Sequence, residues 1–407
     1  MSKVLGIIAE YNPFHNGHLF HLNESKKLTG SSYTVAIMSG NFAQRGNTSI
    51  IDKWSKAKSA IECGVDLVVE LPVLYSTSSA ENFAEGAIKI LDSLKVVDYL
   101  SFGAETADIN LLNNIATVLN EEPKEYKSLL SEELKKGLSY PKARENALMI
   151  YLNDIKKYSN VLSSPNNILG IEYIKAVKRF SSSMEICTIQ RKGQGYNDIS
   201  VPGGENASAA AIRNMLTGDK RGDEAVDRIP ACARDIFREA VDNGMIMTPD
   251  DFSYLLNYKI YSIMRDDSAL LLNYSDVGMQ LANKISRLYG KEHFDGSWKE
   301  LIMKLKSREL TYTRISRALT HILLDIKLDA WNNPPQYARI LGFDKAGSDY
   351  LKAIRKTCAI PLITKVADES WLLKDDIYAA DVYNQTVFEK CGIRIENDFR
   401  HGIIRMQ

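Results

Sequence analysis

Three of the chain's six histidines, His15, His18 and His21, lie within the short stretch YNPFHNGHLFHL near its start. His15 and His18 are three residues apart, so on a helix they share one face and can bind two oxygens of one phosphate. Gly17, which lies between them, lets a ligand approach the backbone closely. Imidazole N–H donors here would stabilise the charge that develops when an α-phosphate is attacked, and His21 extends or backs the same face.

Two other interpretations of these histidines stay open at this point. They could be surface or hydrogen-bonded polar residues at an ordinary helix N-terminus, although His-x-Gly-His directly after a strand disfavours this. They could also chelate zinc, because histidines at this spacing can bind one metal ion. The sequence offers neither a third ligand at helical spacing nor an HExxH motif, so we predict no metal site made by the protein alone.

The elements that position these residues are predicted from the apolar pattern. Runs rich in Val, Ile and Leu without alternation indicate strands buried on both faces, and amphipathic helical segments separate them. The strands fall at residues 3–11, 33–40, 65–72, 98–105 and 184–191, and the first helices at residues 15–28, 51–64 and 79–94. Strict alternation predicts a doubly wound α/β fold with a parallel sheet. Ligands of such sheets bind at the carboxyl ends of the strands, where the histidine stretch lies, and a helix N-terminus there suits phosphate.

The same pattern divides the chain into two parts. We expect residues 1–220 to form the α/β domain, with a mostly helical insertion at about residues 107–180. A polar, glycine-bearing stretch that ends in Pro230 marks the boundary. Helical periodicity dominates residues 221–407, so we predict an α-rich second domain, and short strands around residues 391–396 are compatible with the pattern.

Composition limits the class of protein. Basic and acidic residues both number 51, so any basic surface for nucleic acid has to be local. The cysteines show no CxxC pair, and we expect free thiols of a reducing compartment, not zinc ligands or a disulfide framework. The sequence shows no signal peptide and no apolar run of about 20 residues, so we expect a cytoplasmic protein without a membrane span. The five cysteines are Cys63, Cys187, Cys232, Cys358 and Cys391.

HNGH after the first strand resembles the signature of the HIGH-type nucleotidyltransferases, which use ATP to adenylylate an acid or a phosphate. That superfamily has a second motif, similar to ISSTxIR, at the start of a late helix, and ENASAAAIRNML stands in the corresponding place. Ser208 and Arg213 match it, whereas Ala209 and Ala210 replace the expected hydroxyl residues. The resemblance implies a Rossmann-like fold in which Arg213 pairs with the leaving phosphates. The implied catalytic residues are His15, His18, Ser208 and Arg213.

Longer stretches are similar to one family. GIIAEYNPFHNGHLFHL, MSGNFAQRG, GVDLVVELP, SFGAE, SPNNILGIEYIKA, RKGQGYND and TYTRISRALTHILL together resemble the bacterial tRNA(Met) cytidine acetate ligase family, in order and in spacing. The resemblance implies an enzyme that activates acetate with ATP as acetyl-adenylate. It would then transfer the acetyl group to the exocyclic amine of the wobble cytidine of elongator tRNA(Met), forming N4-acetylcytidine. Mg2+ would be bound through the ATP phosphates.

The resemblance also implies where ATP binds. Gly103 follows the fourth strand, Asn166 or Asn167 would read adenine or cap a helix, and Arg191 ends the fifth strand. The KGQG segment after Arg191 resembles a loop that covers phosphates. An ordinary turn glycine and an exposed arginine are the alternatives for Gly103 and Arg191. The implied ATP contacts are Ile7, Ile8, Ala9, Glu10, Tyr11, Asn12, Pro13, Phe14, His15, Asn16, Gly17, His18, Leu19, Phe20, Gly103, Asn166, Asn167 and Arg191.

Further residues are candidates for binding acetate or tRNA. Gln44 and Arg45 follow the second strand and could hold acetate or the tRNA end, while Lys53 and Lys56 either steer anions or form a solvated face. In residues 311–326, an apolar stripe and a group of basic residues lie on different sides of one helix. We expect phosphate contacts there, with a solvated basic face as the alternative. The RNA-contact candidates are Arg308, Arg314, Arg317 and His321, with Lys304 and Lys306 upstream.

Two rival functions stay open. One is a small-molecule nucleotidyltransferase or acid–amine ligase of the same superfamily, and the other is a noncatalytic RNA-binding protein that keeps an old nucleotide fold. The long α-rich second domain favours a tRNA substrate, and the presence of His15, His18 and Arg213 argues against loss of catalysis. The sequence predicts no oligomeric state.

Overall fold

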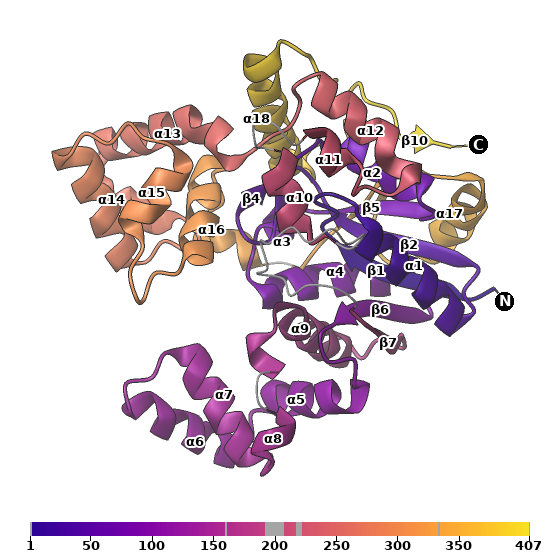
Figure 1. Cartoon of the computed structure of the whole chain (residues 1–407), viewed down its shortest axis with the longest axis horizontal. Coiled ribbons are helices and arrows are strands. Elements are labelled where there is room, and N and C mark those ends of the chain that lie inside the picture. The colour runs from indigo at the N-terminus through magenta and orange to yellow at the C-terminus, as the bar shows by residue number, and fades with distance from the viewer. Residues whose placement is uncertain (1, 159–160, 192–206, 217–221, 333, 407) are drawn as a thin grey trace.

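The computed structural model describes residues 2–158, 161–191, 207–216, 222–332 and 334–406. Its centre is one eight-stranded sheet with the order β10-β8-β5-β2-β1-β6-β7, in which β9 pairs with β8 (Figure 1). A separate hairpin is formed by β3 (Phe42–Ala43) and β4 (Asn47–Thr48). The strands of the sheet are β1 (Val4–Ala9), β2 (Tyr33–Ser39), β5 (Leu67–Leu71), β6 (Tyr99–Ala104), β7 (Glu185–Gln190), β8 (Ala338–Phe343), β9 (Leu362–Ile363) and β10 (Ile404–Arg405).

The five strands predicted from the apolar runs form the parallel part of this sheet. β1 lies at its centre, between β2 and β6, and pairs with both in parallel. β5 is buried throughout, which explains why its run LVVEL does not alternate between apolar and polar residues. The α/β fold with a mostly parallel sheet is therefore confirmed.

Helices cover both faces of the sheet, as expected for a doubly wound fold. One apolar cluster joins β2, β5 and β6 to α4, α5 and α9, and a second joins β1 and β2 to α2, α10 and α12. α1 follows β1 and contributes Leu22 to the second cluster. The bounds are α1 (Asn16–Thr29), α2 (Lys53–Glu62), α4 (Ala80–Leu94), α5 (Ile109–Glu121), α9 (Pro165–Arg179), α10 (Ala209–Leu216) and α12 (Ala231–Asp242).

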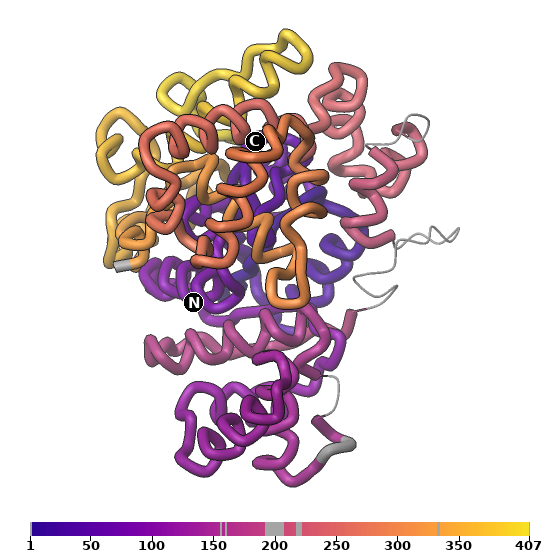
Figure 2. Tube along the Cα trace, turned by 90° about the vertical axis from the view of Figure 1, so that its left-hand side faces the viewer, coloured from indigo at the N-terminus to yellow at the C-terminus, as the bar shows by residue number. Residues whose placement is uncertain are grey.

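Two helical parts project from this core. Between α5 and α9 in the sequence lies a lobe of α6 (Lys124–Lys135), α7 (Tyr140–Tyr151) and α8 (Ile155–Tyr158), which is at the bottom of Figures 1 and 2. The second part, which we call the four-helix unit, consists of α13 (Ser253–Asp266), α14 (Met279–Lys291), α15 (Trp298–Leu305) and α16 (Tyr312–Leu323). These helices share an apolar core to which Phe42, Val73, Ala379, Tyr383 and Val387 also contribute. Among the described helices, none combines the length and the apolar composition that crossing a membrane requires.

The last part of the chain departs from the prediction of an α-rich domain at residues 221–407. β8 pairs antiparallel with β5, and β10 pairs parallel with β8, so residues 338–405 return to the sheet. No strand forms around residues 391–396, where α18 (Lys374–Cys391) ends in a C-cap at Gly392. The run ARILGF of β8 was missed because its partner strand lies far upstream. α3 (Val73–Ser76), α11 (Gly222–Val226) and α17 (Lys345–Thr357) complete the described α-helices.

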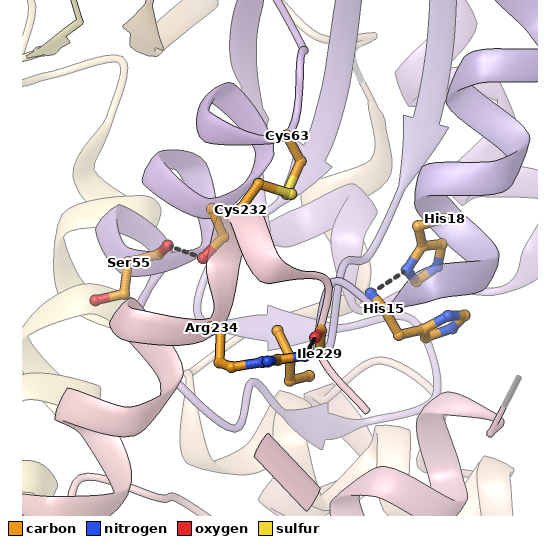
Figure 3. The surroundings of a disulfide bond; sticks show 8 residues. His15, His18, Ser55, Cys63, Ile229, Cys232 and Arg234 are labelled. Carbon is orange, nitrogen blue, oxygen red and sulfur yellow. Dashed lines mark hydrogen bonds between the residues drawn. A yellow bond between two sulfur atoms is a disulfide. The ribbon is translucent and has the colours of Figure 1, made fainter. Parts of the chain in front are cut away.

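The expectation of five free cysteines is wrong for one pair. Cys63, at the end of α2, and Cys232, on α12, form a disulfide (Figure 3). They are 169 residues apart in the sequence, and only the packing of α12 on α2 brings them together. In the described part of the chain, Cys187, Cys358 and Cys391 are free thiols.

Candidate active site

The turn from β1 into α1 fixes the two key histidines in a capping box. His15 is the N-cap residue, and its Nδ1 accepts the N–H of Gly17 at 3.0 Å. His18 Nδ1 accepts the N–H of His15 at 3.3 Å, and the two rings stack with centroids 3.8 Å apart (Figure 3). Because each Nδ1 accepts a backbone N–H, each neutral ring carries its proton on Nε2. The site therefore presents two N–H donors.

Burial keeps these imidazoles neutral. Loss of solvation, followed by the nearby positive charges of Arg191 and Arg213, lowers the pKa of His15 to about 3. The pKa of His18 lies well below its usual value for the same main reason, with His15 and Arg191 adding to it. At neutral pH both side chains are uncharged donors, and the positive charge of the site comes from arginine.

A cavity of about 220 Å³ opens at the carboxyl ends of β1, β6 and β7, and we call it the sheet-edge cavity. Fifteen of the predicted catalytic or ATP-binding residues line it: Ile7, Ile8, Ala9, Glu10, Tyr11, Asn12, His15, Gly17, His18, Phe20, Gly103, Asn166, Arg191, Ser208 and Arg213. Four residues of the predicted ATP stretch, Pro13, Phe14, Asn16 and Leu19, are not among the lining residues. Phe14 packs in the core instead and is 1% exposed.

Arg213 reaches the histidines from a distant part of the sequence. Its Nη1 donates to the carbonyl oxygen of Asn12 at 2.7 Å, which brings α10 to the β1–α1 turn. Ser208, just before α10, accepts the N–H of Ala211 on its Oγ at 3.2 Å. The geometry therefore joins the two motifs at one cavity.

Arg191 lies at the same edge, beside Gly103. The Arg191 N–H donates to Ala104 O at 3.0 Å, and a Cβ on Gly103 would lie 3.3 Å from Arg191 Cγ. Glycine at this strand end therefore leaves room for the arginine side chain. The segment predicted to cover phosphates, Lys192–Gly195, lies outside the described residues.

The structure distinguishes the two candidate asparagines. Asn167 is fully buried, and its side chain bonds Thr106 through Oδ1 at 2.9 Å and through Nδ2 at 3.3 Å. Asn166 lines the sheet-edge cavity, with its Nδ2 held by Glu105 Oε1 at 2.6 Å. The prediction that Asn167 contacts ATP is therefore not supported by this geometry, which favours Asn166.

Sequence reasoning missed the apolar wall of the cavity. Phe83, Phe102, Leu169 and Tyr173 line it and come from α4, β6 and α9. Gly170 lets α9 approach β6 closely, since a Cβ there would lie 2.9 Å from Phe102 Cζ. In the sequence, only the position of Phe102 directly before Gly103 could have indicated this wall. Phe83, Leu169 and Tyr173 reach the cavity only through tertiary packing.

The loop that follows the second strand forms one rim of the cavity. Gln44 and Arg45 line it from the β3–β4 hairpin, and Gln44 N donates to Glu10 Oε1 at 2.8 Å. Lys53 and Lys56, in contrast, form neither a solvated face nor an anion-steering surface, because both are buried. Lys53 Nζ pairs with Glu70 at 3.1 Å and Asp398 at 2.8 Å, while Lys56 Nζ donates to Ser39 O, Gly40 O and Ser49 Oγ.

Only part of the predicted RNA-contact set is available at the surface. Arg308 and Arg314 are exposed, but Arg317 is held by Asp276 through two hydrogen bonds of 2.9 and 3.1 Å. The prediction for His321 is wrong, since it is fully buried and its ring bonds Ser275 O and Thr77 O. The helix pattern placed it beside the arginines and could not show that this flank of α16 faces the core.

α16 is fastened directly to the rim of the cavity. Ser316 Oγ and Thr320 Oγ1 both donate to Gly46 O, at 2.7 and 3.1 Å. Gly46 belongs to the turn that carries Gln44 and Arg45, so the four-helix unit contacts the rim through the β3–β4 hairpin.

Comparisons with known proteins agree with this geometry. A family model described as HIGH Nucleotidyl Transferase matches residues 2–398. The tRNA(Met) cytidine acetate ligases of Caldanaerobacter subterraneus subsp. tengcongensis and Acetivibrio thermocellus are 44% and 39% identical, and each alignment covers 99% of this chain and 100% of the relative.

Two crystal structures of TmcAL from Thermotoga maritima are 32% identical to this chain, each with 99% of both chains covered. The apo form has a TM-score of 0.91, and the form bound with alpha-thio ATP has a TM-score of 0.89. By its sequence over the full length and by its fold, the chain belongs to the tRNA(Met) cytidine acetate ligase family of HIGH nucleotidyl transferases.

Proposed function

We propose that the chain is an ATP-dependent ligase that forms acetyl-adenylate and acetylates the exocyclic amine of the wobble cytidine of elongator tRNA(Met). The observation that carries this proposal is the convergence of His15, His18 and Arg213 on the sheet-edge cavity. The names of the full-length relatives support the same activity. The four-helix unit favours a tRNA substrate over a free metabolite, which would need no such platform.

In the first half-reaction, an acetate oxygen attacks the α-phosphorus of ATP, and the bond to diphosphate breaks. Negative charge grows on the phosphate oxygens, where neutral Nε2–H donors fixed in advance stabilise it without reorganisation. Arg213 and Arg191 supply the positive charge and planar donor geometry that diphosphate requires.

The second half-reaction explains why acetate has to be activated. A cytidine amine is delocalised into its ring and is a poor nucleophile, while acetate alone has a poor leaving group. A mixed anhydride with AMP supplies a good leaving group. A single cavity that holds the anhydride and the amine brings the two reactants together.

Mg2+ fits this site only through the nucleotide. The described residues contain no group of three His, Cys, Asp or Glu side chains that could hold a metal ion. ATP phosphate oxygens would therefore provide most of its ligands, and the ion would neutralise phosphate charge. We further propose a cytoplasmic enzyme whose α/β part binds ATP and whose four-helix unit, through Arg308 and Arg314, contacts tRNA.

The test is to incubate the protein with ATP, labelled acetate and tRNA and to analyse the tRNA nucleosides by mass. We expect acetylated cytidine at the wobble position, and a loss of about 100-fold or more in Arg213→Ala, as for other lost transition-state contacts. Arg265→Ala, on the exposed surface of α13, is the matched control. The proposal would be overturned if the rate of ATP turnover were the same with and without acetate, or if the protein acetylated only a free metabolite.

A further inference from the structure

Glu10 lines the sheet-edge cavity, and beyond the ATP contact that the resemblance implies, its carboxylate takes no part in the first half-reaction. It directly follows β1, and its Oε1 accepts the N–H of Gln44 at 2.8 Å. Among the described residues that line the cavity, it is the one acidic side chain. Its other oxygen has no protein partner in the part of the chain that the structure describes, so it remains available to a ligand.

The other polar groups of the cavity are poor proton acceptors. The Nδ1 atoms of His15 and His18 already accept backbone N–H groups, so their Nε2 atoms carry protons. Burial lowers the pKa of His21 to about 4, and its Nε2 lies 3.2 Å from Ser101 Oγ. Ser208 Oγ accepts the N–H of Ala211. Glu10 is therefore the one carboxylate among these side chains to which a substrate could pass a proton.

Aromatic residues lie near this carboxylate. Phe83, Phe102 and Tyr173 line the same cavity, and the rings of Phe102 and Tyr173 are 5.6 Å apart. Burial, together with the negative charge of Glu10, raises the pKa of the Tyr173 phenol, so the two groups are close enough to interact. Flat apolar surfaces bind an unstacked base, and a carboxylate is the natural acceptor for the exocyclic amine of cytosine.

We propose that Glu10 is the catalytic residue that receives the target cytidine, by accepting a hydrogen bond from its exocyclic amine and then its proton. This inference rests on the proposed function and adds the amine side of the reaction to it. The nitrogen forms a bond to the acetyl carbon, the bond from that carbon to the phosphate oxygen breaks, and its electron pair leaves with AMP. The proton released by the nitrogen passes to the carboxylate of Glu10.

Glu10→Gln separates the two half-reactions. The amide keeps an oxygen for Gln44 N but cannot take a proton, so we expect transfer of acetyl from acetyl-adenylate to tRNA to fall by about 100-fold or more, the usual range for a lost general base. Acetate-dependent exchange of labelled diphosphate into ATP should change far less.

Two further variants and a test of folding make the result decisive. Glu10→Asp restores a carboxylate and should recover part of the transfer rate, and Glu62→Gln, on the exposed end of α2, controls for loss of charge. Thermal unfolding verifies that Glu10→Gln is folded. If Glu10→Gln transfers acetyl to tRNA at the wild-type rate, the inference is wrong. It is also wrong if the rates of diphosphate exchange and of acetyl transfer fall by the same factor, because Glu10 would then act on ATP. A wild-type protein that forms no acetyl-adenylate would instead refute the proposed function itself.

Discussion

His15 and His18 differ from surface histidines because one nitrogen of each ring is already committed to the backbone. His18→Asn keeps an acceptor near the Nδ1 position and removes the Nε2–H donor, whereas His18→Gln keeps a donor near the Nε2 position. We expect His18→Asn to slow acetyl-adenylate formation by about 100- to 1000-fold, as for other lost oxyanion donors. In His18→Gln the rate of acetyl-adenylate formation should fall by a smaller factor. Acetate-dependent exchange of diphosphate into ATP measures both rates.

The same pair of variants separates the donor from the ring. If the donor matters only in the transition state, the ATP dissociation constants of both variants stay close to that of the wild-type protein. Equal rate losses in the two variants would show that the ring itself is needed, and the donor assignment would then be wrong.

The partly buried His21 also predicts how stability depends on pH. The pKa of His21 is lowered to about 4 in the folded protein, against about 6.5 for an unperturbed imidazole. Between these values the unfolded chain binds a proton that the folded chain does not, so stability is full above pH 6.5 and falls as the pH drops. His21→Gln should reduce the slope of unfolding free energy against pH by about 1.4 kcal/mol per unit between pH 6 and pH 4.5. Urea unfolding gives the slopes, and identical slopes would contradict the prediction.

The β3–β4 hairpin connects the cavity rim to the four-helix unit through one glycine. Gly46 has a φ of +68°, and a Cβ on it would lie 2.6 Å from Ser316 O on α16. Gly46→Ala should break both hydrogen bonds to Gly46 O and lower the free energy of unfolding by more than about 1 kcal/mol, the effect of the backbone conformation alone. Acetylation of tRNA should fall as well, because Gln44 and Arg45 share this turn. Denaturant unfolding and the nucleoside assay test the two effects.

Gly30 provides the matched control for Gly46. It has a φ of +64° at the end of α1, but a Cβ there would meet nothing within 4 Å. Gly30→Ala should therefore show only the backbone effect and keep its activity. If both variants are equally stable and active, the close approach of α16 to the hairpin does not hold the rim.

Local patterns predicted the elements that build the cavity. Unbroken apolar runs identified β1, β2, β5, β6 and β7, because a strand buried on both faces needs no partner information to be recognised. The histidine turn and Arg213 were predicted from motifs that resemble a known superfamily. His321 was misassigned because its side chain faces the interior, and which side of a helix is covered depends on the neighbouring elements. For the same reason the sequence could not decide between Asn166 and Asn167, of which Asn167 is buried. The aromatic wall was missed for the same reason.

Interactions across the whole molecule explain why the chain does not divide at residue 220. Asp398, near the end of the chain, accepts from Lys53 at 2.8 Å and from Arg339 at 2.7 Å, and both cations also pair with Glu70. Buried charges have to be paired, so this cluster specifies the return of the last segment to the sheet. Lys53 and Asp398 are 345 residues apart, and no local pattern shows such a pairing. The Cys63–Cys232 disulfide escaped the sequence analysis for the same reason.

The contact between the four-helix unit and tRNA predicts how binding depends on salt. Arg308, just before α16, and Arg314, on α16 itself, are exposed, whereas Arg317 is already paired with Asp276. Each phosphate contact contributes about 0.7 to 0.9 to the slope of log affinity against log salt concentration. Arg308→Ala with Arg314→Ala should therefore weaken binding of tRNA and make this slope shallower by about 1.4 to 1.8. Filter binding over a salt series measures the slope, and Arg265→Ala on α13 should leave it unchanged. If the double variant keeps the wild-type slope, tRNA phosphates are bound elsewhere on the molecule.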